Sequence, residues 1–456
     1  MKHYIAIDWG ATSGRVMVAH VDCINGKNMY QEEVHRFKHA IREAADGHWY
    51  WDFTGLLRET TEGLKKAAAL GYHYESIGVD TWGVDVVFYD GEGRMIAEPL
   101  SYRDPFTAEV TGHFFEQYIS AEKLYHKTGI QFMDFNTVFK LFACRRENYR
   151  PYAEAKHILF LPDAVSYYLT GRMVCEYTAL STSAMMDPRT KDLDAEILAA
   201  CGLNREQFPE VVMPGHDLGT LKEDILAATG LNADCRVVAV AGHDTGSAVA
   251  ACPRVIGGKR AAYLSCGTWS LMGIVTDEPV ITGESCALNF TNEGGVNGTT
   301  RLLKNITGMW ILEQCRKEWA VQGKDYRYDE LVQMAQSVKS NPTLLFNPDE
   351  PRFAKPKSML AEVQGGKALT DQEIIWAIYN SMARRYGEVF RMMQSLAPWQ
   401  IECLYVIGGG VQNKYLLQLT EQAVGVPVVA GPSEATAIGN IMVQHSRCLD
   451  TAITYK

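Results

Sequence analysis

IAIDWGATSGRVMVA, residues 5–19, has an apolar run, a turn of small and hydroxylated residues, and a second apolar run. This order is typical of a β-hairpin, with strands expected at Tyr4–Ile7 and Arg15–Ala19. The same order returns in AAYLSCGTWSLMGIV, residues 261–275. Two matching hairpins in the two halves of the chain indicate two related domains that face each other.

Between and around the hairpins, short β-type runs alternate with longer helical stretches, which predicts an α/β fold. Further strands are expected at Ser76–Val79, Val84–Tyr89 and Cys235–Ala241, a helix at about residues 54–70, and a helical insertion at about 108–166. At 456 residues the chain exceeds what one hydrophobic core usually supports. We expect an N-terminal domain over residues 1–250 and a C-terminal domain over 251–456, joined by the turn-rich connector 253–258 and separated by a central cleft.

Composition excludes several classes of function. A net charge of -10 opposes binding to nucleic acid, which requires clustered Lys and Arg. No apolar stretch approaches the roughly 20 residues of a membrane span, and the N-terminus reaches Asp8 without the apolar region of a signal peptide. The 11 cysteines show neither CxxC nor zinc-type spacing. Reduced thiols in the cytoplasm are therefore expected.

The turn Gly10–Arg15 groups donors that a phosphate requires. Backbone N–H groups at Ala11 and Gly14, the hydroxyls of Thr12 and Ser13, and the Arg15 guanidinium lie within six residues. The chain has no GxxxxGK[ST] loop and no GxGxxG motif, so a hairpin clamp is the better interpretation. The alternative is a plain tight hairpin with Arg15 on the surface.

Asp8 ends the strand beside this turn. Its carboxylate could hold Mg²⁺ through water, because magnesium usually keeps several of its waters. An Asx-turn is the alternative.

Two sites in the second half match this first clamp. Gly267 and Thr268 offer an N–H and a hydroxyl to phosphate oxygens, and Gly408–Gly410 follow the apolar run Leu404–Ile407. Bare backbone at Gly409 would let a flat nucleoside pass closely. A tight connection between strand and helix is the competing explanation for the three glycines.

His243-Asp244-Thr245 follows a buried strand, where a general base for phosphoryl transfer would be placed. The alternative role of Asp244 is the N-cap of the next helix. In VDTWGVDVV, residues 79–87, Asp80 and Asp85 flank Trp82 and Gly83 and supply polar groups and an aromatic face of the kind that binds sugars. A buried Trp within a strand pair is the plain alternative.

Together these motifs resemble the carbohydrate kinases named for a Phe-Gly-Gly-Tyr signature, which share an ATPase core with actin and hexokinase. The matching segments, in the family's order, are DWGATSGR, SIGVDTWGVD, YRD (102–104), GIQF (129–132), YYLTG (167–171), GHDTGSA, YLSCGTWSLMG, NEGG (292–295), LKNITGMW, GGGVQN and GPSEATAIGN. They span residues 8–440. The resemblance implies two actin-like, ribonuclease H-like domains around a central cleft, with the nucleotide held by the C-terminal domain.

The resemblance also implies site residues. ATP would contact Ala11, Thr12, Ser13, Gly14, Arg15, Thr268 and Gly409, and the sugar would contact Gly83, His243, Asp244, Thr245 and Asn305, with Asp244 as proton acceptor. Glu313 stands where the family's pattern has a Gln that contacts ATP, so no contact is assigned there. The family's sequences usually continue about thirty residues past the position of Gln444, whereas this sequence stops at Lys456, so we expect the closing helix to be missing or replaced.

The implied reaction is transfer of the γ-phosphoryl group of MgATP to L-rhamnulose. Related kinases of L-fuculose or xylulose are alternatives within the class. From the residues alone, the prediction reaches only an ATP-dependent kinase that acts on a polar hydroxylated molecule. A non-catalytic, nucleotide-gated sugar-binding protein would need the phosphate turns but no base, and His243-Asp244 disfavours it.

Overall fold

A computed structural model describes residues 1–22, 29–354 and 356–448, and its chain divides into two compact units. Unit 1 contains residues 1–251 and 276–302 and, from residue 436, helix α17 (Ala435–Cys448). Unit 2 contains residues 252–275 and 303–435. Within the described residues the chain therefore leaves unit 1, returns to it, leaves again and returns with α17, so neither unit is one contiguous stretch.

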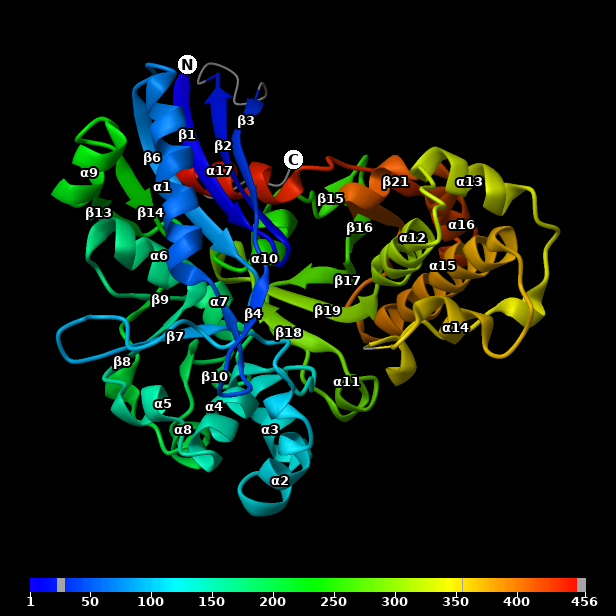
Figure 1. The fold of residues 1–456 in the computed structure, drawn as a ribbon, viewed down its shortest axis with the longest axis horizontal. Coiled ribbons are helices and arrows are strands. Elements are labelled where there is room, and N and C mark those ends of the chain that lie inside the picture. The colour runs from blue at the N-terminus through cyan, green and yellow to red at the C-terminus, as the bar shows by residue number, and fades with distance from the viewer. Residues whose placement is uncertain (23–28, 355, 449–456) are drawn as a thin grey trace. The chain divides into compact units, whose positions relative to one another are not determined.

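The main sheet of unit 1 has the strand order β13-β14-β6-β1-β2-β3 (Figure 1). β1 pairs antiparallel with β2 and parallel with β6, and β6 pairs parallel with β14. The bounds are β1 Lys2–Trp9, β2 Ser13–Val21, β3 Met29–Lys38, β6 Tyr74–Thr81, β13 Asp217–Thr220 and β14 Arg236–Val238. The predicted strands at 4–7, 15–19 and 76–79 are confirmed, and the one at 235–241 is shorter than predicted.

Both faces of this sheet are covered, because successive residues of a strand point to opposite faces. Ile5, Ile7 and Trp9 belong to the core that includes helix α1 (Phe53–Ala69). Tyr4 and Ala6 pack instead with Ala437 and Ile441 of α17. α1 begins after its N-cap Asp52, whose side chain accepts from the N–H of Gly55, so the helix predicted at about 54–70 is confirmed.

The predicted strand at Val84–Tyr89 begins two residues late, as β7 (Val86–Tyr89). Val84 has φ of 68°, which is outside the β region and is costly for a β-branched residue. The chain therefore turns at residues 83–85 before the strand can start. β7 pairs antiparallel with β8 (His157–Phe160).

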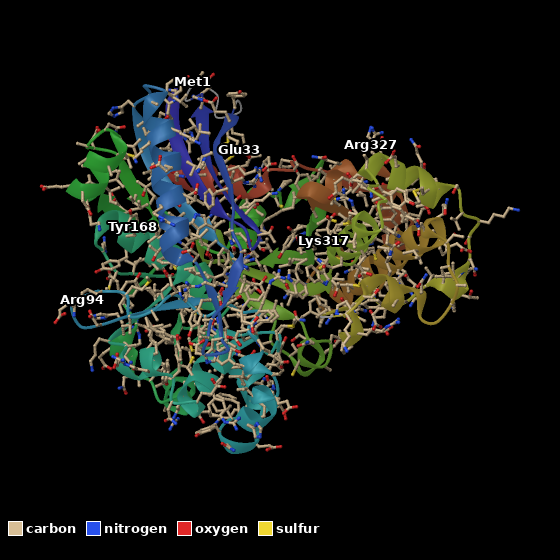
Figure 2. All side chains as sticks on the ribbon, viewed as in Figure 1. Met1, Glu33, Arg94, Tyr168, Lys317 and Arg327 are labelled. Carbon is tan, nitrogen blue, oxygen red and sulfur yellow. The ribbon has the colours of Figure 1, made fainter. Side chains whose placement is uncertain are left out.

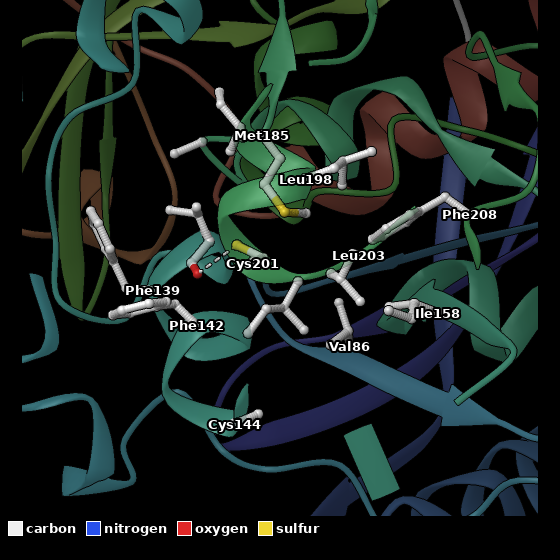
Figure 3. Packing of buried hydrophobic residues seen from close by; sticks show 14 of the residues in the cluster. Val86, Phe139, Phe142, Cys144, Ile158, Met185, Leu198, Cys201, Leu203 and Phe208 are labelled. Atoms are coloured by element: carbon white, nitrogen blue, oxygen red, sulfur yellow. Dashed lines mark hydrogen bonds between the residues drawn. The ribbon is translucent and has the colours of Figure 1, made fainter. Parts of the chain in front are cut away.

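Helices fill most of residues 108–166. They are α2 (Val110–Gln117), α3 (Ala121–Thr128), α4 (Thr137–Arg146), α5 (Arg150–Glu154) and the start of α6 (Leu161–Thr170). The apolar faces of α2 to α5 share one core with α8 (Ala195–Cys201), in which the Cys201 thiol donates to the carbonyl of Val138 (Figure 3). The buried aliphatic residues of α6 belong instead to the core of the main sheet and α1.

The remaining short elements of unit 1 connect these layers. They are β4 (Ile41–Glu43), β5 (Trp49–Trp51), β9 (Cys175–Glu176), α7 (Tyr177–Ser181), β10 (Met186–Asp187), β11 (Asp192–Leu193), β12 (Val211–Val212), α9 (Glu223–Thr229), α10 (Asp244–Ala250), α11 (Gly283–Ala287) and β18 (Thr291–Gly294). α7, α10 and β18 position most of the site described below.

The second sheet repeats the order of the first, as β18-β19-β17-β16-β20-β21 with β15 paired to β16. β16 pairs antiparallel with β17 and parallel with β20, as β1 does with β2 and β6. The bounds are β15 Val255–Ile256, β16 Lys259–Cys266, β17 Trp269–Thr276, β19 Thr300–Thr307, β20 Cys403–Ile407 and β21 Val428–Ala430. The second hairpin and the strand before the three glycines are thus confirmed.

The helices of unit 2 are α12 (Trp310–Val321), α13 (Tyr328–Gln336), α14 (Met359–Gln364), α15 (Asp371–Leu396) and α16 (Lys414–Val424). α15 buries a stripe at helical spacing that includes Ile375, Ile378, Met382 and Tyr386.

Charged side chains such as Glu33, Arg94, Lys317 and Arg327 project from the ribbon and are exposed (Figure 2). Among the described residues, no helix combines the length and apolarity needed to cross a bilayer. The expectation that the closing helix is missing or replaced concerns the end of the chain, where residues 449–456 lie outside the described part.

Candidate functional site

The carboxyl ends of the parallel strands in unit 1 gather the acidic residues that the sequence singled out. Asp8 of β1 is the register partner of Asp80 in β6 and of Arg15 in β2. One residue further along β6, Thr81 forms an isolated parallel bridge with His243. The backbone register therefore brings the turn at residues 10–15, the DTWG segment and the GHDTG segment to the carboxyl ends of neighbouring strands in one sheet.

Asp8 and Arg15 form an ion pair across the hairpin. Nε and Nη2 of Arg15 lie 2.9 and 2.7 Å from Oδ2 of Asp8. Only 17% of the Arg15 side chain and 7% of the Asp8 side chain is exposed, so the alternative of a surface arginine is wrong. The turn itself is closed by the N–H of Gly10, which donates to the carbonyl of Ser13 at 3.0 Å, and leaves Thr12 exposed.

Asp80 is fully buried on the face that α17 covers. Its Oδ2 accepts from Nδ2 of Asn440 at 2.6 Å, and its Oδ1 has no hydrogen-bond partner among the described residues. Burial raises the pKa of Asp80 well above its usual range, and the charge of Asp8 raises it further, against the bond from Asn440. Burial and the charge of Asp8 therefore both favour the protonated form of Asp80.

His243, Asp244 and Thr245 form the junction between β14 and α10. His243 is the N-cap residue and Asp244 the first residue of the helix, so the alternative of Asp244 as the N-cap is wrong by one position. Oδ1 of Asp244 accepts from the N–H of Thr245 at 2.6 Å and from its hydroxyl at 3.2 Å. Nearly a third of the Asp244 side chain, 31%, stays exposed.

The electrostatics of Asp244 suit a proton acceptor. Burial raises its pKa and the charge of Asp8 raises it further, whereas His243 and the bonds from Thr245 lower it. Burial and Asp8 thus favour the protonated form of Asp244, whereas His243 and Thr245 favour the ionised form. The net result is a pKa above that of an exposed Asp.

Gly83 lies against the His243 ring. A Cβ at residue 83 would sit 3.2 Å from Cδ2 of His243 and 3.2 Å from the hydroxyl of Thr182. Trp82 next to it is buried at 5% exposure. The indole N–H groups of Trp51 and Trp82 both donate to Asp85, which also pairs with the buried Lys140. The plain alternative for Trp82 and Asp85 is therefore what the structure shows, and the aromatic face is not presented to a sugar.

Three buried residues that sequence reasoning assigned no role support the junction. Glu176 accepts from the N–H of Gly242 at 2.9 Å and so holds the loop that leads to His243. Glu293 and Arg301 surround Nδ1 of His243 at 3.4 and 3.3 Å. Glu293 stands in the NEGG segment, which the sequence analysis matched to the family without assigning a function to any of its residues. Arg301 lies in no motif, so only the fold could reveal its place beside His243.

In unit 2, Thr268 and Gly409 are exposed and Asn305 is half-buried on β19. The carbonyls of Gly267 and Thr268 accept from the N–H groups of Met309 and Trp310, which ties the hairpin turn to the start of α12. A Cβ at Gly410 would come within 2.2 Å of Sγ of Cys266, so a close approach requires glycine there. At Gly409 a Cβ would meet nothing within 4 Å, which leaves space for a ligand beside the backbone.

The acidic edge of unit 1 fits a divalent cation held mainly by water and substrate. Within the described part of the chain, no group of three or more His, Cys, Asp or Glu side chains is placed to bind a metal directly. Yet the mutual repulsion of Asp8, Asp80 and Asp244 raises the pKa of Asp80 and of Asp244. A cation near Asp8 would relieve that repulsion, and Mg²⁺ usually binds through one or two carboxylates plus waters and phosphates.

Comparison with known proteins agrees with this layout. Residues 3–251 match the FGGY family of carbohydrate kinases, N-terminal domain, and residues 262–447 match its C-terminal domain. The chain is similar to the rhamnulokinase of Bacteroides thetaiotaomicron, at 47% identity over 97% of this chain and 90% of that protein. It is also similar to the rhamnulokinase of Bacillus subtilis, at 38% identity over 97% of this chain and 89% of that protein. The solved gluconate kinase of Lactobacillus acidophilus shares the fold, with a TM-score of 0.82 at 14% identity over 99% of this chain and 90% of that one.

Proposed function

The chain belongs to the FGGY family of carbohydrate kinases, and on this premise we propose that it transfers the γ-phosphoryl group of MgATP to the 1-hydroxyl of L-rhamnulose. The products are L-rhamnulose 1-phosphate and ADP, formed in the breakdown of L-rhamnose. Membership of this family supports the reaction class, which is phosphoryl transfer to a sugar. The substrate is supported by the two relatives named above, which share it in their names and align over nearly the whole chain.

The observation that carries the mechanism is Asp244, a partly exposed carboxylate in an otherwise buried junction. In the proposed step the sugar O1 attacks the γ-phosphorus, the bond from that phosphorus to the β,γ-bridging oxygen breaks, and ADP leaves with that bond's electrons. The proton of O1 passes to Asp244. Because phosphoryl transfer needs little covalent help, Asp244 contributes mainly by accepting this proton late in the reaction.

Nucleotide contacts are proposed on both units. Ala11, Thr12, Ser13, Gly14 and Arg15 form a turn whose N–H groups, hydroxyls and guanidinium suit phosphate oxygens, and Thr268 and Gly409 offer a hydroxyl and bare backbone. Asp8 would hold Mg²⁺ through water while it stays paired with Arg15. When bound, the ion neutralises charge on the phosphate oxygens.

For the sugar, the proposed contacts are Gly83, His243, Asp244, Thr245 and Asn305. Gly83, His243 and Asp244 are neighbours in unit 1, since the ring of His243 touches the Gly83 backbone on one side and lies 3.4 Å from Asp244 on the other. A cytoplasmic location is proposed as well. It is supported by nine free cysteines among the described residues and by the need for ATP.

One assay tests the substrate: ADP release measured with purified protein across L-rhamnulose, L-fuculose, D-xylulose, D-gluconate and glycerol. We expect the highest kcat/KM with L-rhamnulose, and phosphorus NMR of the product should show a phosphate ester at carbon 1. A higher kcat/KM with another ketose would replace the substrate but keep the kinase. Sugar binding without ADP release would favour a non-catalytic binding protein.

A further inference from the structure

Arg301 is a completely buried cation directly behind the proposed base. Its side chain has no exposed surface, and its Nε donates to the carbonyl of Gly294 at 2.8 Å. Nη2 lies 3.1 Å from Oε2 of Glu293 and 3.3 Å from Nδ1 of His243. On the other side of the same ring, Nε2 of His243 lies 3.4 Å from Oδ1 of Asp244. A continuous chain of contacts therefore runs from Glu293 and Arg301 through His243 to Asp244.

The direction of hydrogen bonding in this chain follows from Arg301. A guanidinium has only donors and never loses its proton in a protein, so Nδ1 of His243 must accept from it. Oε2 of Glu293, although 3.4 Å from Nδ1, has no hydrogen-bond partner of acceptable geometry among the described residues. A neutral imidazole that accepts at Nδ1 carries its proton on Nε2. That proton faces Asp244.

Glu293 has a separate task in the same group. A fully buried cation is costly without a counter-charge, and Glu293 is the carboxylate beside Arg301. Burial alone would raise the pKa of Glu293, but Arg301 and then His243 outweigh it and lower that pKa. Glu293 therefore stays ionised and keeps Arg301 in place.

We propose that Arg301 is a positioning residue that fixes His243 as the Nε2–H tautomer, so that His243 donates to Asp244 and holds it as a carboxylate, with Glu293 as the counter-ion of Arg301. This inference rests on the proposed function where it treats Asp244 as the base. It adds residues that act through His243 and touch no substrate. The reverse tautomer would point the lone pair of Nε2 at the Asp244 carboxylate, and the two would repel each other.

The charged groups that face this pair come from several elements. Asp244 feels the charges of His243, the N-cap residue of α10, and of Asp8 of β1, and both Asp8 and Asp244 act on Asp80 of β6. Arg301 of β19 and Glu293 of β18 lie on the far side of the ring. Asp8 favours protonation of Asp244, and the Nε2–H group opposes it, so loss of the correct tautomer should shift the acid limb of the rate profile to higher pH.

The tautomer can be read directly by nitrogen NMR of protein labelled with [¹⁵N]histidine, with the His243 signals assigned from their absence in His243→Asn. At pH 8 we expect an unprotonated Nδ1 and a protonated Nε2 in the wild type. Arg301→Met removes the donor but leaves Glu293 near Nδ1, so the proton should move to Nδ1. Glu293→Gln keeps the donor and should keep the wild-type tautomer. A protonated Nδ1 in the wild type would overturn the proposal.

Kinetics supply the second readout. Arg301→Met/Glu293→Met removes both charges together, which avoids an unpaired buried carboxylate. We expect kcat to fall by about 10- to 100-fold, with a smaller change in KM for ATP and with the acid limb moved to higher pH. Glu293→Gln should lose less than the double variant. Lys127→Met, which breaks a partly buried ion pair with Asp194 elsewhere in unit 1, serves as the control and should keep wild-type kcat.

The outcomes separate this inference from the proposed function. A folded double variant with wild-type kcat and pH profile shows that Arg301 is only structural and overturns the inference. If the double variant does not fold, the wild-type and Glu293→Gln spectra still decide the tautomer. If no sugar is phosphorylated by the wild type, the proposed function fails, and the spectra again report on the tautomer alone.

Discussion

The turn between β1 and β2 and the turn between β16 and β17 stand at the same place in two sheets of the same strand order, but they are built differently. The first is braced by an ion pair, with Arg15 Nη2 2.7 Å from Asp8. The second is braced by neutral groups, since the hydroxyls of Ser270 and Tyr386 lie 2.7 Å apart and Cys266 packs on Gly410.

The shared strand order of the two sheets thus determines where each turn lies, whereas the few side chains at the ends of the turn determine which ligands it can bind. In unit 1 the ends of β1 and β6 and the start of α10 carry Asp8, Asp80 and Asp244, for which we propose cation binding and proton transfer. In unit 2 the corresponding turn offers the Thr268 hydroxyl, and a separate turn after β20 offers open backbone at Gly409, groups that suit an anionic or flat ligand. We therefore expect substitutions in unit 1 to change turnover and those in unit 2 to change nucleotide affinity.

The largest effect should come from Asp244→Asn. The amide keeps the side-chain oxygen that accepts from Thr245 but cannot take a proton at neutral pH, so kcat should fall by about 100-fold or more. Thermal unfolding and calorimetry with ATP should stay close to wild type. Near wild-type turnover would show that Asp244 only starts helix α10. It would also contradict the expectation that substitutions in unit 1 change turnover and those in unit 2 change nucleotide affinity.

A second test compares the two turns directly. Arg15→Ala should raise KM for ATP by about 10- to 100-fold, because a charge-assisted contact to phosphate is lost, whereas Thr268→Ala should raise it by only about fivefold. Calorimetry with sugar in the absence of nucleotide should give unchanged affinity for both variants. If either variant loses sugar binding, the wrong ligand has been assigned to that turn.

The comparison also shows what sequence can and cannot predict. Apolar runs flanking small-residue turns predicted both hairpins, because strand formation and turn formation depend on neighbours in the chain. The partners of Asp80 and His243 could not be predicted, since Asn440 and Arg301 lie far from them in sequence. Val84 illustrates the local limit, because its φ is positive although its side chain favours strands, and the residue after it, Asp85, is held by Lys140 and two tryptophans from other parts of unit 1.

Asp80 in unit 1 and Lys304 in unit 2 should contribute to stability with opposite pH dependence. Burial raises the pKa of Asp80 in unit 1, so its contribution to stability falls as the pH rises from its unfolded value toward its folded one. In unit 2, burial and Arg385 lower the pKa of Lys304 from 10.5 to about 8, against the opposing effect of Asp349. Between these values the unfolded chain binds the extra proton, so this contribution to stability rises with pH.

Lys304→Met removes that cost. The variant should be more stable than wild type at pH 7 by about 1–2 kcal/mol, and its advantage should shrink above pH 8 and be smallest near pH 10.5. Asp349 keeps Arg385 as its partner at 2.8 Å, so the substitution leaves no unpaired carboxylate. Denaturant unfolding at several pH values measures the difference, and an advantage that grows with pH would contradict the assignment.

The smallest effect is expected at Tyr386, and it tests whether the second turn is truly braced without charge. Tyr386→Phe removes the hydroxyl that lies 2.7 Å from Ser270 and 3.7 Å from Sγ of Cys266, in a position with no exposure. The loss should be about 1 kcal/mol, typical of a neutral hydrogen bond. Burial raises the pKa of Tyr386 far above its ordinary value, so the hydroxyl is neutral at any working pH and the loss should not change with pH or salt. Arg15→Ala, measured beside it, removes a partly exposed ion pair and should cost less as salt increases. Equal salt dependence in the two variants would show that the turns are braced alike, because only a charged contact is weakened by screening.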